Sequence, residues 1–290
     1  MSFALNAWKR SFSAARTEHR GLVLLAPRRS EIPGSFSLGK FDRDEYEHLL
    51  AEMQRFRGAT YLKDEAISAQ DLDETGRHRL DVDTQSWHVL SLDDDGHVCG
   101  CSRLTGWNKN VEFHNLGVGK SALAQSDIWG SKLRMAVEKE MQIAAFSDLT
   151  FSEVGGWAIA EKLRRTTEAL RIALATYALG QVLGGVIGLT TATVRHSSAN
   201  VLRKIGGCSL VNDATELPKY FDPQYGCEME ILRFNSNEPN PRFAPWIQQI
   251  RSELLSVPVL TAGGPNPQQI PAGSYEDMGI QQLSLAWQFS

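Results

Sequence analysis

A stretch without any charged side chain runs from Ile172 to Val194, and it constrains the fold more than any other feature of the sequence. About 20 consecutive apolar residues can cross a bilayer as a helix, so its length alone would permit a membrane span. Its middle and second half, however, contain glycines and threonines where a spanning helix would carry leucine. We therefore predict a buried helix ending at Gly180, a turn at Gly184 and Gly185, and a buried strand through Thr193.

Composition and charge narrow the class of protein. The 290 residues are 42% hydrophobic and 22% charged, which is typical of a globular chain and excludes a disordered or collagen-like one. With a net charge of -4, no nucleic-acid partner is expected. Four cysteines are too few for a disulfide framework and are typical of a reducing compartment, so we expect a cytoplasmic protein.

Periodicity and turn signals predict the other elements. Asp42 and Glu45 form a capping box that begins an amphipathic helix over residues 43–57. Residues 85–92 and 97–104 form a hairpin around an Asp-Gly turn. The remaining elements are helices at 131–146, 166–179, 197–205 and 243–255, strands at 149–159, 186–194 and 226–234, and an edge strand at 22–26.

This alternation predicts an α/β sheet with one core. We assign residues 41–235 to that core, residues 1–40 to an N-terminal extension, and residues 236–290 to a C-terminal helix and tail. The two extensions are expected to cover the core, to cap a ligand tunnel or to form a homodimer.

Several familiar motifs are incomplete. Residues 116–121 resemble a phosphate-binding loop, but His114 stands where that pattern requires glycine. Cys99 and Cys101 lack a second pair at zinc spacing, and the histidines are scattered, so no metal site is expected. A Ser-His-Asp triad needs no fixed spacing, but no G-x-S-x-G turn nominates its serine.

One constellation surrounds the strand at 149–159. Glu153 lies in an otherwise apolar strand, and Gly155 and Gly156 follow it as a predicted bulge. Arg164, Arg165 and Thr166 then lead into a helix, whose free amides and positive dipole end favour an anion such as phosphate. The alternative is that the two arginines are solvated and pair with Glu161 or Glu168.

Five segments together resemble the GCN5-related N-acyltransferase superfamily. They are residues 57–62 (RGATYL), 81–88 (DVDTQSWH), 96–104 (GHVCGCSRL), 153–159 (EVGGWAI) and 198–206 (SANVLRKIG). Within the superfamily the chain is similar to the acyl-homoserine-lactone (autoinducer) synthases and to bacterial N-acyl amino acid synthases. No single segment is specific for this group, but their order along the chain is.

The resemblance implies a mixed, splayed sheet that opens between residues 149–159 and 186–194. The pantetheine arm of an acyl carrier protein or coenzyme A thioester would lie in the opening, with no tightly bound cofactor. The implied donor-binding residues are Trp157, Ile159, Arg164, Arg165 and Thr166. The implied acceptor-binding residues are Arg57, Asp83, Trp87 and Arg103.

The chain departs from the family pattern in two places. Gly155 and Gly156 replace a Ser-Arg pair, so the acceptor need not follow homoserine-lactone chemistry. The usual glycine-rich phosphate loop is missing between Leu163 and Thr167, which leaves the choice between acyl carrier protein and coenzyme A open.

The resemblance implies transfer of a medium or long acyl group from a thioester to the amine of a small molecule. Glu153 is expected to act as the base, with its pKa raised by its apolar strand. The amides of Gly155 and Gly156 would hold the oxyanion, and Tyr220, Tyr225 and His196 are weaker candidates for protonating the thiolate.

Two alternatives stay open. Glu153 could pair with Arg103 across the sheet and hold the strands in register. The whole chain could be an acyl-carrier or ligand-binding module that has the fold without catalysis.

Overall fold

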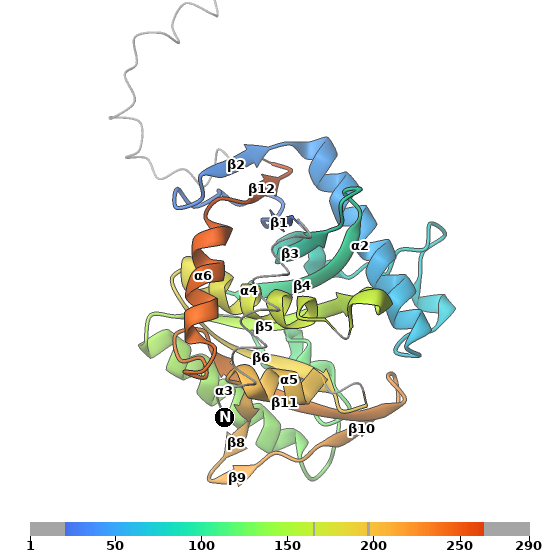
Figure 1. Cartoon of the computed structure of the whole chain (residues 1–290). Coiled ribbons are helices and arrows are strands. Elements are labelled where there is room, and N and C mark those ends of the chain that lie inside the picture. Colours follow the sequence, from blue (N-terminus) through green and yellow to red (C-terminus); the bar gives the residue numbers. More distant parts are fainter. Residues whose placement is uncertain (1–20, 165, 196–197, 264–290) are drawn as a thin grey trace, which may run out of the picture.

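The structure, a computed structural model, describes residues 21–164, 166–195 and 198–263 (Figure 1). Its strands are β1 Leu22–Leu25, β2 Leu38–Phe41, β3 Trp87–Leu92, β4 Val98–Trp107, β5 Thr150–Ile159, β6 Val186–Thr193, β7 Cys208–Ser209, β8 Val211–Asn212, β9 Thr215–Glu216, β10 Tyr220–Asp222, β11 Cys227–Asn235 and β12 Pro258–Thr261. Its α-helices are α2 Arg43–Lys63, α3 Gly130–Phe146, α4 Glu168–Val182, α5 Ser198–Ile205 and α6 Ala244–Leu254.

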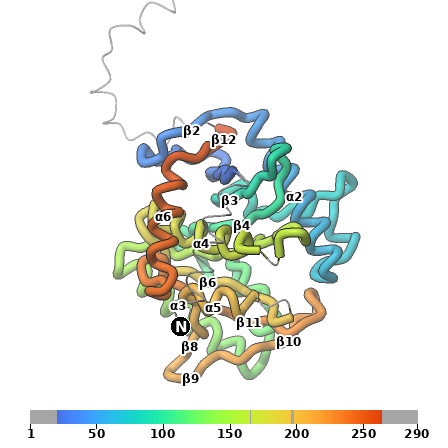
Figure 2. The backbone as a smooth tube through the Cα atoms, in the orientation of Figure 1, coloured from blue at the N-terminus to red at the C-terminus, as the bar shows by residue number. Residues whose placement is uncertain are grey.

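Ten of the strands form one mixed sheet, as the sequence predicted. Its order is β10-β11-β6-β5-β4-β3-β1-β12-β2, with β7 also paired to β11. Figure 2 shows this succession from β2 and β12 at the top to β10 at the bottom. The β5–β6, β1–β12 and β12–β2 pairs are parallel, and the other pairs are antiparallel.

The uncharged stretch folds as a helix, a glycine turn and a strand. α4 runs two residues past the predicted end at Gly180, and Gly184 and Gly185 then turn the chain with φ of 98° and 100°. Side chains other than glycine rarely adopt these angles. β6 follows and is buried over most of its length. Among the described helices, none is long and apolar enough to span a membrane.

The start of α2 forms half of the predicted capping box. The Asp42 side chain accepts a hydrogen bond from the Glu45 amide (3.0 Å), but the Asp42 amide donates to Thr261 O (3.1 Å). The predicted helix end at residue 57 was wrong, because α2 continues to Lys63. Burial of Arg57 and Gly58 on the inner side of the helix explains the continuation.

The prediction of an edge strand at 22–26 was also wrong. β1 lies inside the sheet, with β3 antiparallel on one side and β12 parallel on the other. Both partners satisfy the backbone groups of β1, and its side chains are buried. The described parts of both predicted extensions therefore add strands to the sheet, and the domain boundaries stay predictions.

Helices cover both faces of the sheet. α2 packs over β4 and the end of β5, where Val23, Leu25, Leu90 and Ala158 form a buried cluster with its Tyr46, Leu49, Leu50 and Met53. α3 packs on the same side over β5 and β6. α4 and α6 cover the opposite face around Leu24, Val89 and Val259. The site lies between these two layers.

Candidate active site

β5 and β6 pair over only the first part of their lengths. Residues Thr150 to Val154 of β5 are in register with Val186 to Thr190 of β6, and no pairing joins the residues beyond. β5 continues along β4, and β6 continues along β11. The sheet therefore opens at the carboxyl ends of two parallel strands, as the resemblance implied, and the carboxyl ends of parallel strands commonly bind ligands.

A β-bulge lies at this opening. Cys101 of β4 is opposite Ala158, whereas Arg103 is opposite Gly155, so β5 contains one extra residue between the pairs. Gly156, with φ of 64°, occupies the bulge, which confirms the predicted glycine bulge. The extra residue also moves the following side chains of β5 to the opposite face.

Arginine side chains pack beneath both glycines, and the φ of 64° favours glycine at position 156. A Cβ atom on Gly155 would lie 3.2 Å from Arg103 Nη2, and one on Gly156 would lie 3.3 Å from Arg103 Cβ and 3.5 Å from Arg57 Nη1. The backbone of β5 therefore passes directly over both guanidinium-bearing side chains. At Gly155 the close atom is the end of the Arg103 side chain, so a small residue there requires only a shift of that side chain.

A cavity of about 330 Å³ passes through the opening and reaches both faces of the sheet. On the side of α2, its lining includes Tyr61, His78, Leu80 and Arg103. On the side of α4, its lining includes Ser102, Ala173, Thr176, Tyr177 and Leu202. Gly155 and Gly156 lie where the two halves meet.

Asp83 lies behind the polar half, fully buried and outside the cavity lining, and Arg103 is the charged residue of this group that reaches the lining. Arg57, also fully buried, donates from Nη1 to Asp83 Oδ1 (2.9 Å) and from Nη2 to Asp83 Oδ2 (2.7 Å). Arg103 Nη1 approaches Asp83 Oδ1 at 3.4 Å, and Gln54 donates to Asp83 Oδ2 at 2.9 Å. The structure thus brings together the three charged residues that the resemblance named for acceptor binding.

The electrostatics of this framework follow from burial and charge. Burial alone would raise the pKa of the Asp83 carboxyl, but the hydrogen bonds and charge of Arg57 hold that pKa well below its usual range. Two guanidinium groups then face one carboxylate, which leaves an excess positive charge. The Nε atoms of Arg57 and Arg103 are buried and lack a hydrogen-bond partner among the described residues.

Trp87, predicted to bind the acceptor, is not brought to this framework. It begins β3 and points to the opposite face from His88, where its ring stacks on Phe36 with 5.7 Å between centroids. It is absent from the cavity lining. The residue therefore packs in the core beneath α4 and α6.

Glu153 lines the cavity, but its carboxylate is already bound. It accepts hydrogen bonds from the amides of Gly117 (2.9 Å) and Val118 (2.9 Å) and from the indole of Trp107 (3.1 Å). The alternative pairing with Arg103 is not observed. Three of about four lone-pair sites on the carboxylate are occupied, so little capacity remains to take a proton from a substrate.

Glu153→Gln is therefore expected to act mainly on stability. The glutamine NH2 group would face backbone donors, and the lost charge-assisted bonds would lower the free energy of unfolding by about 2–3 kcal/mol. Urea denaturation measures this change, and turnover per folded molecule should fall less than tenfold. An unchanged stability with abolished turnover would contradict the anchoring role and restore Glu153 as the base.

The candidate tyrosines lie in different places. Tyr220 packs against the cluster beneath α3, outside the cavity lining. Tyr225, five residues later, does line the cavity. The third candidate, His196, lies outside the described residues.

The predicted donor-binding residues are dispersed. Trp157 lines the cavity, whereas Ile159 packs into a core cluster with Leu163 and Ile172. Arg164 forms a bidentate pair with Asp64 (2.8 and 2.7 Å), and not with Glu161 or Glu168. Thr166 bonds to Leu163 O (2.8 Å), and Arg165 lies outside the described residues.

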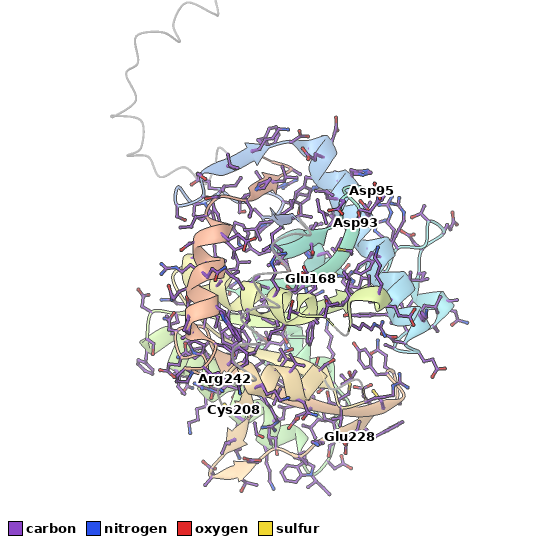
Figure 3. The ribbon with its side chains drawn as sticks, in the orientation of Figure 1. Asp93, Asp95, Glu168, Cys208, Glu228 and Arg242 are labelled. Carbon is purple, nitrogen blue, oxygen red and sulfur yellow. The ribbon has the colours of Figure 1, made fainter. Side chains whose placement is uncertain are left out.

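The start of α4 carries its own anion. Glu168, in the first turn of α4 (Figure 3), is buried, accepts from the Ser91 hydroxyl (2.6 Å), and pairs with Arg171 (3.3 Å). This carboxylate complements the helix dipole in the way that we predicted for a phosphate. Arg164 does not line the cavity itself, but its ion-pair partner Asp64 does.

Sequence reasoning missed His78. Its ring lies 5.7 Å from that of Tyr61, and its Nδ1 is buried without a partner among the described residues. Burial, with the charge of Arg57, lowers the pKa of His78 to about 4, so the ring is neutral at pH 7. It lies in a segment without periodicity, and no sequence signal placed it beside the framework.

Comparisons with known proteins find similarity only among solved structures. No family model matches the sequence, and no curated protein matches it. The CoA-dependent acyl-homoserine lactone synthase BjaI, with SAM and isopentyl-CoA, is 12% identical over 85% of this chain and 95% of that chain, with a TM-score of 0.49. The acyl-homoserine lactone synthase LasI is 14% identical over 75% and 91% of the two chains, with a TM-score of 0.42.

A third similar structure is FeeM, an N-acyl amino acid synthase from uncultured soil microbes. It is 10% identical over 76% of this chain and 93% of that chain, with a TM-score of 0.43. The three structures come from the two kinds of synthase that the sequence segments resemble.

Proposed function

We propose that the protein is an N-acyltransferase that moves an acyl group from a thioester to the amine of a small molecule by direct attack. The observation that carries this proposal is one continuous cavity that passes through the sheet. It joins a charged half beside Asp83 to an apolar half beneath α4. Direct transfer requires both substrates to meet at one point, and the opening between β5 and β6 supplies that point.

The reaction forms an amide bond and breaks a carbon–sulfur bond. The amine nitrogen attacks the thioester carbonyl beside Gly155 and Gly156, where backbone groups facing β6 have no partner strand. Such amides stabilise the developing oxyanion. The amine attacks in its neutral form beside the neutral ring of His78, and the departing thiolate is the final acceptor of its proton.

The acceptor is proposed to be an amine that also carries a carboxylate, such as an amino acid. The excess positive charge of Arg57 and Arg103 over Asp83 supports this choice, since guanidinium groups bind carboxylates in bidentate geometry. Arg103 is the more accessible of the two, with a side chain 14% exposed beside the cavity.

Arg103→Met is expected to raise the KM for the acceptor at least tenfold while changing the KM for the acyl donor less than twofold. The lost charge-assisted bonds are worth about 1.5–3 kcal/mol. Initial-rate kinetics with each substrate varied in turn measure both constants. Equal effects on the two constants would contradict the placement of the acceptor carboxylate.

The function is tested by release of free thiol from acyl thioesters. Acyl-coenzyme A and acyl-carrier-protein donors of several lengths are combined with amino acids and with amines that lack a carboxylate. We expect thiol release that depends on the amine, with amide formation confirmed by mass spectrometry. No release across the whole panel would overturn the proposed activity.

The second candidate is a binding module without catalysis. The commitment of Glu153 to Gly117, Val118 and Trp107 favours it, because the strand then offers no free carboxylate base. Tight binding of an acyl thioester without thiol release would favour the module.

We also propose a cytoplasmic location. No disulfide joins any of the four cysteines, although Cys99 and Cys101 are buried two residues apart on β4. Burial raises the pKa of Cys101 to about 12, which keeps that thiol protonated and unreactive. Free thiols are typical of proteins from a reducing compartment.

A further inference from the structure

A second cavity lies on the other side of Asp83 from the acyl cavity. Its volume is about 320 Å³, which is within the range of small-molecule sites. Its lining includes three arginines and two carboxylates, which are Arg28, Arg77, Arg79, Glu47 and Asp81. Gln54 also lines it and donates to Asp83 (2.9 Å), whereas Arg103 approaches Asp83 from the acyl cavity (3.4 Å). Asp83 therefore lies between the two cavities.

One short segment, residues 77–80, separates the two cavities. His78 lines the acyl cavity, Arg77 and Arg79 line the second cavity, and Leu80 lines both. Side chains that alternate between two sides in this way are typical of extended chain. A ligand in the second cavity therefore lies on the back of the wall that carries His78.

The walls of the second cavity are held together by hydrogen bonds. The His78 amide donates to Gln54 O of α2 (3.1 Å), and the His78 carbonyl accepts from Arg57 Nη2. The Arg28 amide donates to Thr84 O (2.8 Å), which ties the chain after β1 to the segment before β3. Because each wall is joined to its neighbour, the cavity is a fixed feature of the fold.

The charges of the lining favour an anion. Three guanidinium groups are accompanied by two carboxylates, so one positive charge is in excess. Arg28 pairs with Glu47 inside the cavity lining (2.5 Å), whereas Arg79 pairs with Asp73, outside the lining, at the longer distance of 3.7 Å. Arg77 forms no ion pair among the described residues. Arg77 and Arg79 are therefore the two arginines with charge to offer a ligand.

We propose that the second cavity binds a small molecule through a carboxylate or phosphate group, and that Arg77 and Arg79 hold this group. Guanidinium groups bind such oxyanions through charge-assisted, often bidentate, hydrogen bonds. The bound anion adds negative charge behind Asp83, which reduces the excess positive charge that attracts the acceptor carboxylate to Arg103. The ligand therefore weakens acceptor binding. This effect on the acceptor rests on the proposed function, whereas the site itself does not.

Titration calorimetry of the full chain tests the site with inorganic phosphate and, separately, with succinate at constant ionic strength. We expect one site with a Kd of about 1 mM or below for at least one of the two anions. Arg77→Met should weaken this binding about tenfold or more, because it removes charge-assisted bonds. Binding of only one anion supports the site and tells whether the ligand carries a phosphate or a carboxylate. No saturable binding of either anion up to about 10 mM would overturn the inference.

A second variant and a matched control exclude misfolding and a general change of charge. Arg79→Met alters a side chain that is 66% exposed, so the core is untouched, and it should weaken binding about threefold. Arg55→Met removes an exposed arginine of α2 that lines neither cavity and should leave the Kd unchanged. Wild-type Kd values in both Arg77→Met and Arg79→Met, or an equal loss in Arg55→Met, would overturn the inference.

Initial-rate kinetics test the effect on the acceptor. With saturating anion, we expect the KM for the acceptor to rise about two- to fourfold, since the two negative charges repel each other, while the KM for the donor stays the same. The effect should disappear in Arg77→Met, which also excludes binding of the anion at Arg103 as its cause. A fall in the KM for the acceptor, or an effect that persists in Arg77→Met, would overturn the assigned role.

Calorimetry also separates failure of this inference from failure of the proposed function. If no donor releases thiol, the anion and the amino acid can still be titrated in each other's presence. Each should weaken the binding of the other by the same factor, because coupling between two sites is reciprocal. Saturable anion binding that Arg77→Met removes supports the site even without turnover, and its absence overturns the site whatever the thiol assay shows.

Discussion

Asp83→Ala is expected to lower the free energy of unfolding by about 3–5 kcal/mol and to abolish acyl transfer. The substitution removes the acceptor of hydrogen bonds from Arg57, Gln54, Arg103 and the Leu80 amide. Arg57 would then be a fully buried charge without its carboxylate, which is among the costliest defects a core can contain. Urea denaturation measures the stability and the thiol assay the activity.

Two further variants test whether the loss of stability comes from the unpaired buried charge. Asp95→Ala removes an exposed carboxylate from the β3–β4 turn (Figure 3) and should change stability by less than about 0.5 kcal/mol. The double variant Arg57→Met with Asp83→Leu should recover most of the lost stability, because it removes both buried charges, yet it should stay inactive. A loss below 1 kcal/mol in Asp83→Ala would contradict the framework as described.

Acidification from pH 6.5 toward pH 4 is expected to destabilise the fold by up to about 1.4 kcal/mol per pH unit for each of two histidines. Burial lowers the pKa of both His78 and His88 to about 4, from an ordinary value near 6.5. The unfolded chain therefore binds protons in this window that the folded chain does not, so stability falls as pH falls. Below pH 4 the Asp83 carboxyl, whose pKa is lowered in the fold, adds to the loss.

Denaturant titrations between pH 5 and pH 8 measure how the free energy of unfolding changes with pH. His88→Gln should flatten it, whereas His48→Gln should not, because His48 is exposed on α2, with 72% of its side chain accessible. A stability that is constant between pH 5 and pH 7 would contradict the neutral state of the two histidines in the fold.

Local signals in the sequence were sufficient to predict most of the helices and strands. The uncharged stretch with its paired glycines predicts α4, the turn and β6, because only glycine fits the turn at Gly184 and Gly185. The Asp-Gly turn likewise predicts the β3–β4 hairpin, where Gly96 has φ of 83°. The edge position assigned to β1 failed, because its neighbour β12 lies more than 230 residues away in the sequence.

The site was predictable only in part. Arg57, Asp83 and Arg103 follow from the ordered segments that resemble a known group. The hydrogen-bond partners of Glu153 could not be predicted in this way, because Gly117 and Val118 lie more than 30 residues earlier in a segment without periodicity. Trp87 was named for acceptor binding but lies on the other face of the sheet, since strand alternation alone does not tell which face of β3 meets the site.

The central claim is that the opening between β5 and β6 holds the acyl thioester with its carbonyl beside Gly155 and Gly156. A crystal structure with a non-transferable acyl thioether tests it most directly. We predict that the sulfur lies beyond the Val154–Thr190 pair, with the acyl chain beneath α4 toward Tyr177. An acyl chain bound anywhere outside this cavity would contradict the account.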